Sequence, residues 1–184
     1  MAPSTTAFVA LLRGINVGGK YLVAMTEVTE AFREAGHANV RTHGQSGNVL
    51  FETEHGEASA LESSIETFFH KQFGIPIVVV IRSREQMAAT VAEAPPDHGS
   101  DLLRSDVFFL KSPLTANAVF AKLPELREGV DSMAPGPGAL YFSRVAAQAT
   151  KTRVQRVFAM PEFQQMTVRT WKVTTRLLKL LDGS

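Results

Sequence analysis

The order in which strand-like and helix-like segments alternate is the feature that most constrains the fold of this chain. Short apolar runs suited to buried strands are separated by segments whose apolar residues recur at the spacing of an amphipathic helix. In the first half the order is strand, helix, strand, strand, helix, strand, which is typical of a ferredoxin-like unit. The expected strands lie at 7–13, 40–43, 49–53 and 76–81, and the expected helices at 26–35 and 58–72.

The second half repeats this order more weakly. A short helix is expected first, from Ser83 to Ala92, because Ser83 and Gln86 have the spacing of a capping box. The strands that follow are expected at 106–111, 129–133, 140–143 and 166–169, and the helices at 115–123, 151–158 and 171–181. Pro135-Gly136-Pro137-Gly138 indicates a turn before the third of these strands. We therefore predict an α+β protein of two ferredoxin-like (βαββαβ) subdomains, each followed by an extra helix.

The clearest linker signal is Ala94–Ser100, which contains two prolines, an aspartate and a glycine. It predicts an N-terminal subdomain over 1–93, a linker over 94–104 and a C-terminal subdomain over 105–184. A chain of 184 residues is long enough for two small units of this kind.

Composition excludes several classes of site and indicates the compartment in which the protein is expected. The chain has no cysteine, which excludes disulfides, iron–sulfur clusters and thiolate zinc sites and favours a reducing compartment. The N-terminus has no basic stretch before its short apolar run, so we expect no signal peptide. No segment approaches the roughly 20 apolar residues of a membrane span. We expect a soluble, cytoplasmic protein.

Positive charge is concentrated near the end of the chain. Between Arg144 and Leu181 eight cations and one acid give +7, so the rest of the chain carries −6 of the overall +1. The predicted basic face consists of Arg169 together with a helical stripe of Lys172, Arg176 and Lys179. Such a face attracts phosphate-bearing partners, although a solvated helix surface or pairing with the acidic first half explains it equally well. Trp171 shares the opposite face with leucines, which favours packing over base stacking.

A glycine-rich segment follows the first predicted strand. Arg13 to Lys20 contains three glycines, one asparagine and two cations. Glycine allows the backbone to turn with positive φ and lets a ligand approach main-chain N–H groups, so the segment is a candidate anion cradle. A loop that merely connects strand to helix is the alternative interpretation.

The predicted topology brings a second polar loop to the same place. The first two strands of a βαββαβ unit run in the same direction, so the loop after the first strand and the hairpin after the second emerge at one end of the sheet. Two polar loops at one sheet end form a better candidate site than either alone. The predicted ligand-binding residues are Arg13, Gly14, Asn16, Gly18, Gly19, Lys20, Gln45, Ser46 and Asn48.

The sequence partly matches two catalytic motifs, a P-loop and a nucleophile elbow, and it lacks the residue spacing of a metal site. Gly14, Gly19 and Lys20 have the spacing of a phosphate-binding P-loop, but Tyr21 stands where that motif needs a hydroxyl for Mg²⁺. The segment 44–48 resembles a nucleophile elbow but joins two strands and ends in asparagine. We predict no metal site, because the five histidines lack ligand spacing; they are His37, His43, His55, His70 and His98.

The residues that carry a family resemblance are the decapeptide at 11–20, Gln45-Ser46-Gly47-Asn48 and Met166–Trp171. With these motifs the chain resembles the bacterial domain-of-unknown-function family 1697. The resemblance implies an α+β fold of two subdomains, in agreement with the pattern above. It implies no catalytic residues.

These observations lead to one functional hypothesis and two alternatives. We expect a cytoplasmic protein that binds an anionic, phosphorylated small molecule or nucleic acid through the convergent glycine loops, without a cofactor. The alternatives are a metal-independent enzyme acting on a small anionic substrate, and a purely structural or oligomeric protein. The sequence identifies neither a ligand nor a reaction.

Overall fold

The structure is a computed structural model and describes residues 4–54 and 56–183. The chain forms two compact units. Unit 1 comprises the chain up to Met87 together with the segment from Leu177 onward, and unit 2 comprises Ala88–Arg176. The division falls at 87/88, the predicted linker 94–104 lies within unit 2, and the chain returns to unit 1 after completing unit 2.

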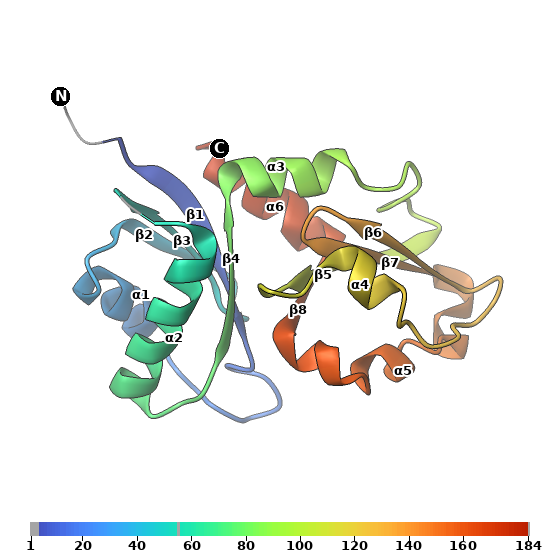
Figure 1. Ribbon diagram of the computed structural model, residues 1–184, viewed down its shortest axis with the longest axis horizontal. Coiled ribbons are helices and arrows are strands. Elements are labelled where there is room, and N and C mark those ends of the chain that lie inside the picture. Colours follow the sequence, from blue (N-terminus) through green and yellow to red (C-terminus); the bar gives the residue numbers. More distant parts are fainter. Residues whose placement is uncertain (1–3, 55, 184) are drawn as a thin grey trace. The chain divides into compact units, whose positions relative to one another are not determined.

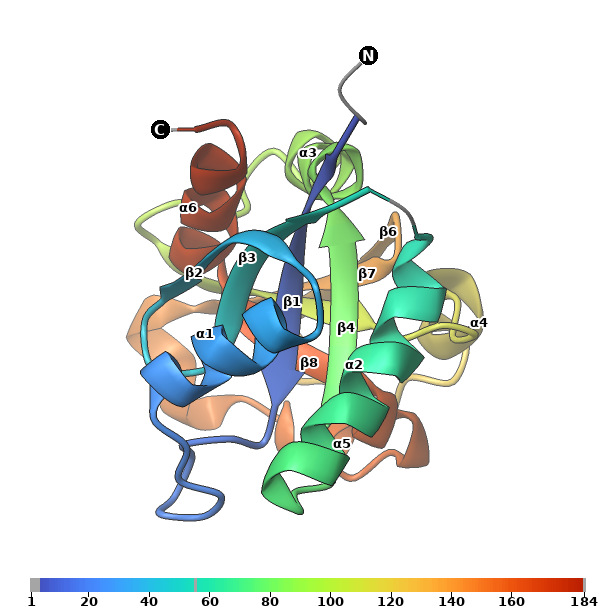
Figure 2. The ribbon, with the colours of Figure 1, turned by 90° about the vertical axis from the view of Figure 1, so that its left-hand side faces the viewer.

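Unit 1 contains a four-stranded antiparallel sheet in the order β2-β3-β1-β4. Its elements are β1 (Thr6–Arg13), α1 (Met25–Glu34), β2 (Ala38–His43), β3 (Asn48–Thr53), α2 (Ala58–Phe73) and β4 (Val78–Ser83). Both helices lie on the same face of this sheet (Figure 1, Figure 2). This is the predicted ferredoxin-like arrangement.

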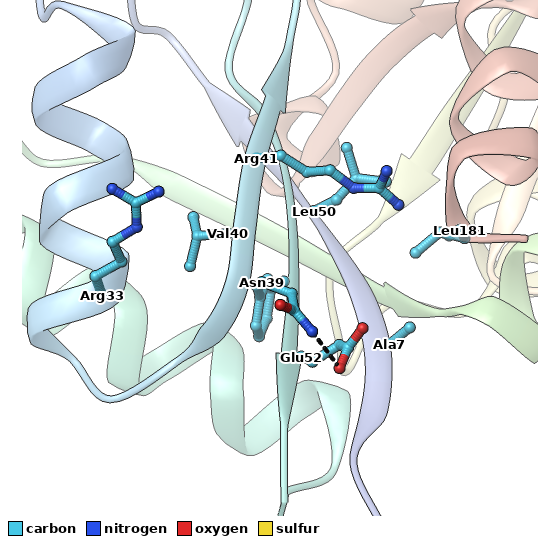
Figure 3. Close-up of a pocket in the computed structure, with 9 residues that line it drawn as sticks. Ala7, Arg33, Asn39, Val40, Arg41, Leu50, Glu52 and Leu181 are labelled. Carbon is cyan, nitrogen blue, oxygen red and sulfur yellow. Dashed lines mark hydrogen bonds between the residues drawn. The ribbon is translucent and has the colours of Figure 1, made fainter. Parts of the chain in front are cut away.

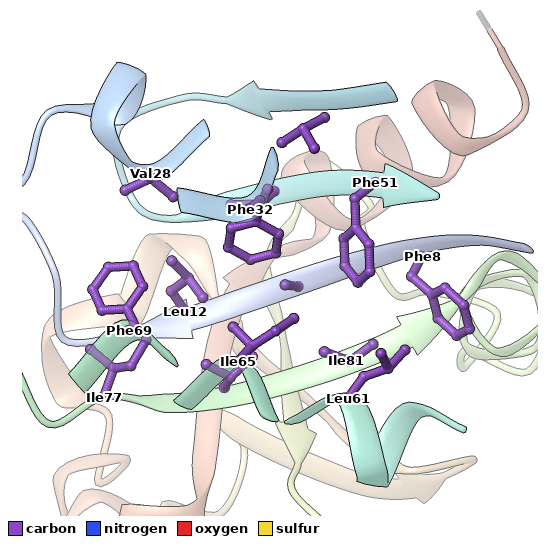
Figure 4. Packing of buried hydrophobic residues seen from close by; sticks show 14 of the residues in the cluster. Phe8, Leu12, Val28, Phe32, Phe51, Leu61, Ile65, Phe69, Ile77 and Ile81 are labelled. Atoms are coloured by element: carbon purple, nitrogen blue, oxygen red, sulfur yellow. The ribbon is translucent and has the colours of Figure 1, made fainter. Parts of the chain in front are cut away.

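The core of unit 1 lies between its sheet and its two helices (Figure 4). Phe8, Ala10 and Leu12 alternate along β1 and join this core, because every second side chain of a strand points to the same face. Phe32 from α1 and Phe69 from α2 close it from the other side. The core fixes the direction of β1, and hence the place where the glycine-rich segment leaves the sheet.

The outer edge of β4 is covered by two glutamates of α2. Glu62 accepts a hydrogen bond from the Ile81 N–H at 3.0 Å, and Glu66 accepts one from the Val79 N–H at 2.8 Å. Glu62 is buried and lies 3.7 Å from the guanidinium of Arg82, which is also buried. These carboxylates bond backbone donors that an edge strand would otherwise expose.

Unit 2 contains a second four-stranded antiparallel sheet, in the equivalent order β6-β7-β5-β8. Its strands are β5 (Leu103–Leu110), β6 (Asp131–Gly136), β7 (Ala139–Val145) and β8 (Met166–Thr170). Its helical segments are α4 (Ala116–Phe120), η1 (Ala146–Lys151), α5 (Gln155–Phe158) and η2 (Pro161–Gln165). The extra helices that follow the two βαββαβ patterns are α3 (Arg84–Ala92) and α6 (Trp171–Leu181). The protein is thus α+β with two related sheets, as predicted.

Two local predictions in unit 2 were wrong. The helix expected at 151–158 is divided into η1 and α5, because Asp131 accepts hydrogen bonds from the Thr152 hydroxyl at 2.6 Å and the Arg153 N–H at 2.8 Å and holds both residues between the helices. The turn expected over 135–138 is narrower, since Pro135 lies within β6. β6 is an edge strand, and a proline is tolerated at an edge.

Helix capping follows the sequence at one helix and departs from it at another. Ser83 and Gln86 form the expected capping box, with the Gln86 N–H donating to Ser83 Oγ at 3.2 Å and the Ser83 N–H donating to Gln86 Oε1 at 2.8 Å. Helix α1, in contrast, is capped at Ala24 and not at Thr26. The Ala24 N–H donates to the Glu27 carboxylate at 3.1 Å, so an acidic side chain supplies the start signal.

No helix in the described part of the chain has the length and apolarity needed to cross a membrane.

Candidate functional site

The glycine-rich segment after β1 forms a tight hairpin. The Lys20 N–H donates to the Val17 carbonyl at 3.2 Å, and both central residues of the turn have positive φ, Gly18 at 60° and Gly19 at 73°. Positive φ at both central positions defines a type I′ turn, which favours glycine. No helix begins at the Gly-Lys pair, since α1 starts at Met25, so the segment is not a P-loop.

Asn16 fixes the shape of this hairpin. Its Oδ1 accepts the Val23 N–H at 2.9 Å, while its Nδ2 donates to the Val23 carbonyl at 2.9 Å and to the Gln45 carbonyl at 3.1 Å. The bond to Gln45 joins the hairpin to the turn between β2 and β3, so the two loops meet in the structure. The side-chain amide of Asn16 is engaged with backbone groups of both loops, so Asn16 acts as a latch that holds the hairpin in shape.

The second loop, which joins β2 to β3, is hydrogen-bonded to β1 through Gly47. The Leu12 N–H donates to the Gly47 carbonyl at 2.8 Å, and a Cβ on Gly47 would lie 2.8 Å from Leu12 Cβ. Asn48 is only 1% exposed, and its Nδ2 donates to the His43 carbonyl at 2.9 Å. Asn48 is therefore held within its own turn, and its predicted role in binding stays a prediction.

The groups that remain accessible lie along the hairpin and the adjacent turn. Gly14, Gly18 and Gly19 are exposed, and a Cβ built on any of them would meet no atom within 4 Å. Lys20, Gln45 and Ser46 are exposed as well. Arg13 is partly buried, and burial lowers the pKa of its guanidinium. Three apolar side chains accompany these polar groups, with exposed fractions of 61% for Val17, 47% for Tyr21 and 74% for Leu22.

The predicted basic face loses one member. Arg169 is buried within β8, where its guanidinium donates to Thr167 Oγ1 at 2.8 Å and to the Val168 carbonyl at 2.9 Å. Burial lowers the pKa of Arg169 to about 10. Alternation along the strand places Arg169 on the same face as Thr167, opposite the face by which Met166 and Val168 join the core of unit 2. Lys172, Arg176 and Lys179 are exposed on α6, as expected.

Unit 1 contains a cavity of about 630 Å³ beside β2 and β3 (Figure 3). Its charged and polar side chains have partners within the protein. Asn39 donates to the Glu52 carboxylate at 2.9 Å, Arg33 pairs with a carboxylate one turn earlier in α1 at 2.6 Å, and Arg41 donates to the carbonyl of Leu180. These internal pairs make the cavity a weak candidate for binding a charged ligand.

Unit 2 contains a buried polar network that sequence reasoning missed. His98 Nδ1 lies 3.0 Å from Ser143 Oγ, which lies 2.9 Å from Ser105 Oγ, and Ser105 Oγ accepts the Gly99 N–H at 2.9 Å. The ring of Trp171 meets the His98 ring edge-on, with centroids 4.8 Å apart. The pKa of His98 is lowered by burial, against smaller opposing effects of Asp97 and the Asp106 backbone. No sequence signal predicted this network, because Ser105 lies outside the strand expected at 106–111 and its opposition to Ser143 follows from the observed register.

Among the described residues, no three His, Cys, Asp or Glu side chains are grouped so that they could hold a metal ion. His55, one of the histidines considered above, lies outside the described residues.

Fold and loops together define a class: an α+β protein built from two ferredoxin-like sheets, with a latched glycine hairpin at the end of its first strand. The chain belongs to the family described as protein of unknown function (DUF1697), whose model matches residues 5–141. The motif at 166–171 lies beyond the matched residues, so its part in the resemblance stays a prediction.

A solved structure shows the same fold across nearly the whole chain. The conserved bacterial protein SP0830 from Streptococcus pneumoniae is 25% identical to this chain and superposes with a TM-score of 0.85. The match covers 97% of this chain and 99% of that one. No curated protein sequence matches this chain.

Proposed function

We propose that this protein binds a phosphorylated small molecule at the latched hairpin, residues 13–22. The observation that carries the proposal is the combination of three exposed glycines with a neighbouring lysine on a loop whose shape is already fixed. Within the described residues, the N–H groups of Gly14, Gly18 and Gly19 have no hydrogen-bond partner. Backbone donors of this kind bind anions well when a cation stands beside them, as Lys20 does here.

Pre-organisation supports the same proposal. Asn16 holds the hairpin through three backbone hydrogen bonds, one of which reaches the second loop at Gln45. A loop that is already ordered loses little conformational entropy when it binds, so more of the contact energy appears as affinity. In this proposal Gln45 and Ser46 face the ligand from the second loop, while Asn16 and Asn48 act only through the backbone.

The apolar side chains of the hairpin narrow the ligand class. Tyr21 and Leu22 are large, exposed and directly follow Lys20. Exposed aromatic and aliphatic surface beside cationic and amide donors suits a molecule with both an anionic and an apolar part. A nucleoside phosphate or an aryl phosphate has this character.

The test is a titration of ¹⁵N-labelled protein with inorganic pyrophosphate and with adenosine monophosphate, at constant ionic strength. The amide signals of Gly14, Gly18 and Gly19 are expected to shift and saturate, with tighter binding of the nucleotide. Lys20→Ala is expected to weaken binding by about tenfold, because a charge-assisted contact is lost. Lys71→Ala, which removes an exposed lysine from the end of α2, is the matched control and is expected to bind normally.

Two outcomes would contradict this proposal. If neither probe moves the three glycine amides, the hairpin does not bind anions and a structural role replaces the proposed one. If a single-stranded oligonucleotide binds instead, with log K falling by ~0.7 per neutralised phosphate as log salt rises, the partner is nucleic acid.

A further inference from the structure

A second cavity lies within unit 2 and is independent of the hairpin. It has a volume of about 480 Å³ and is lined by the turn that precedes β5, the first residues of β5, Arg144 on β7 and the beginning of α6. Cavities of this size accommodate metabolite-sized ligands. Three cations border it, namely Arg104, Arg144 and Lys172.

The two arginines face each other from neighbouring strands. Arg104 and Arg144 are direct partners in the antiparallel register of β5 and β7. Like charges in directly opposite positions repel each other, so this pair favours an anion beside it. Within the described residues, neither guanidinium makes a hydrogen bond or an ion pair at contact distance, although Asp106 attracts Arg144 electrostatically.

The acid placed to pair with Arg144 is engaged elsewhere. Asp131 is the partner of Arg144 in the register of β6 and β7. Its carboxylate instead accepts hydrogen bonds from the Arg127 N–H at 3.0 Å, the Thr152 hydroxyl at 2.6 Å and the Arg153 N–H at 2.8 Å. The Nε of Arg144 is left buried without a hydrogen-bond partner in the described part of the chain. A buried, unpaired donor is uncommon and calls for an acceptor.

The cavity is bordered by two carboxylates against three cations, which leaves one positive charge in excess. Asp106 lies on β5 two residues after Arg104, on the same face, and burial raises the pKa of its carboxyl against the opposing attraction of Arg144. Asp101 is exposed at the rim. Helix α6 begins at Trp171, so the positive end of its dipole also borders the cavity.

We propose that this cavity is a binding site for a phosphorylated metabolite, with Arg104 and Arg144 holding the phosphate and Trp171 forming one wall beside the rest of the molecule. Two guanidinium groups provide forked donors that match the oxygens of a phosphate. Lys172, which also lines the cavity, adds a third positive charge. This inference does not depend on the function proposed for the hairpin, because it uses different residues in the other unit.

The protein carries its own reporter for the test. Trp171 is the only tryptophan of the chain, so its fluorescence reports on the cavity. Inorganic phosphate titrated into the full-length protein at constant ionic strength is expected to change this fluorescence and to saturate. Arg104→Gln removes an exposed guanidinium without disturbing the core and is expected to weaken phosphate binding by about tenfold. Arg144→Gln is expected to weaken it at least as much.

Two control variants make the test specific. Arg176→Gln removes an exposed cation of α6 that does not line the cavity, and it is expected to titrate like the parent protein. Lys20→Ala also leaves this titration unchanged, which separates a failure here from a failure at the hairpin.

The proposal is overturned if phosphate leaves Trp171 fluorescence unchanged, or if Arg104→Gln binds phosphate as tightly as the parent does. It is also overturned if acetate saturates the fluorescence change while phosphate has no effect, because the site would then be selective for carboxylates.

Discussion

Gly99 shows how a single missing side chain can position a larger neighbour. Its φ is +84°, and a Cβ built there would lie 2.1 Å from Cδ1 and 2.3 Å from Nε1 of Trp171. The indole therefore packs against bare backbone, and it also meets the ring of His98. Because Trp171 borders the unit 2 cavity, Gly99 contributes to the shape of that wall.

We expect Gly99→Ala to destabilise the protein more than an equivalent change in open space. Both the left-handed backbone and the clash with the indole oppose the new methyl group, and overpacking alone costs about 1–3 kcal/mol. The matched control is Gly129→Ala, where φ is +73° and no atom lies within 4 Å of the new Cβ. The difference between the unfolding free energies of the two variants, measured in urea, isolates the cost of the clash with Trp171. Equal losses of unfolding free energy in both would show that Trp171 moves aside at no cost.

At the same scale, the sequence predicted that the two loops meet, but not how each side chain is used there. The topology placed Asn16 and the Gln45 loop at one sheet end, and the structure joins them by a hydrogen bond of 3.1 Å. Asn48 was expected to face a ligand but is buried, because residues that close a tight hairpin turn their amides toward the backbone. Accessibility of this kind depends on rotamer and packing, which residue type alone does not reveal.

At the scale of elements, β4 is an edge strand whose outward amides are bonded by a helix. Glu62 and Glu66 are spaced four residues apart on α2 and meet alternate residues of the strand, Ile81 and Val79. This pattern suits a helix packed alongside a strand. It also explains why a charged residue such as Glu62 can be buried beside the apolar residues of α2.

We expect Glu62→Ala to lower the unfolding free energy by about 3–5 kcal/mol, because it leaves both the Ile81 N–H and the buried Arg82 without this partner. Glu62→Gln keeps an oxygen that can accept the Ile81 N–H and removes only the charge, so a smaller loss is expected. Chemical denaturation of both variants provides the measurement. A loss below about 1 kcal/mol for Glu62→Ala would mean that water reaches Arg82 in the variant.

Some element boundaries followed closely from a local sequence signal, and one helix failed because its interruption comes from a distant residue. Helix α6 begins at 171 and ends at 181 as expected, because its apolar spacing is regular. The helix expected at 151–158 was wrong because the interruption comes from Asp131, which lies about 20 residues earlier in the chain. The burial of Glu62 was likewise invisible, since its partners belong to another element.

At the scale of the whole molecule, each unit contains a histidine whose neutral form is favoured by burial. Burial lowers the pKa of His37 in unit 1 and of His98 in unit 2, the latter against a smaller opposing effect of Asp97. The unfolded chain, with histidine pKa values near 6.5, therefore takes up protons before the folded protein does. The stability contributed by the neutral rings is fully present above that pH and is lost as the pH falls through it.

We therefore expect the unfolding free energy to decrease between about pH 7.5 and about pH 5.8, a range in which few carboxylates titrate. His98→Gln is expected to reduce this decrease, and His37→Gln combined with His98→Gln to reduce it further. Denaturant unfolding at the two pH values tests this expectation. A double variant with the same pH dependence as the parent would assign the effect to other groups.

The path of the chain through the two units sets the order in which they can be completed during synthesis. A ribosome makes Met87, then all of Ala88–Arg176, and only afterward the residues from Leu177 that belong to unit 1. Unit 1 is therefore begun first and completed last. Its segment from Leu177 onward is synthesised only after the whole of unit 2, including the second sheet.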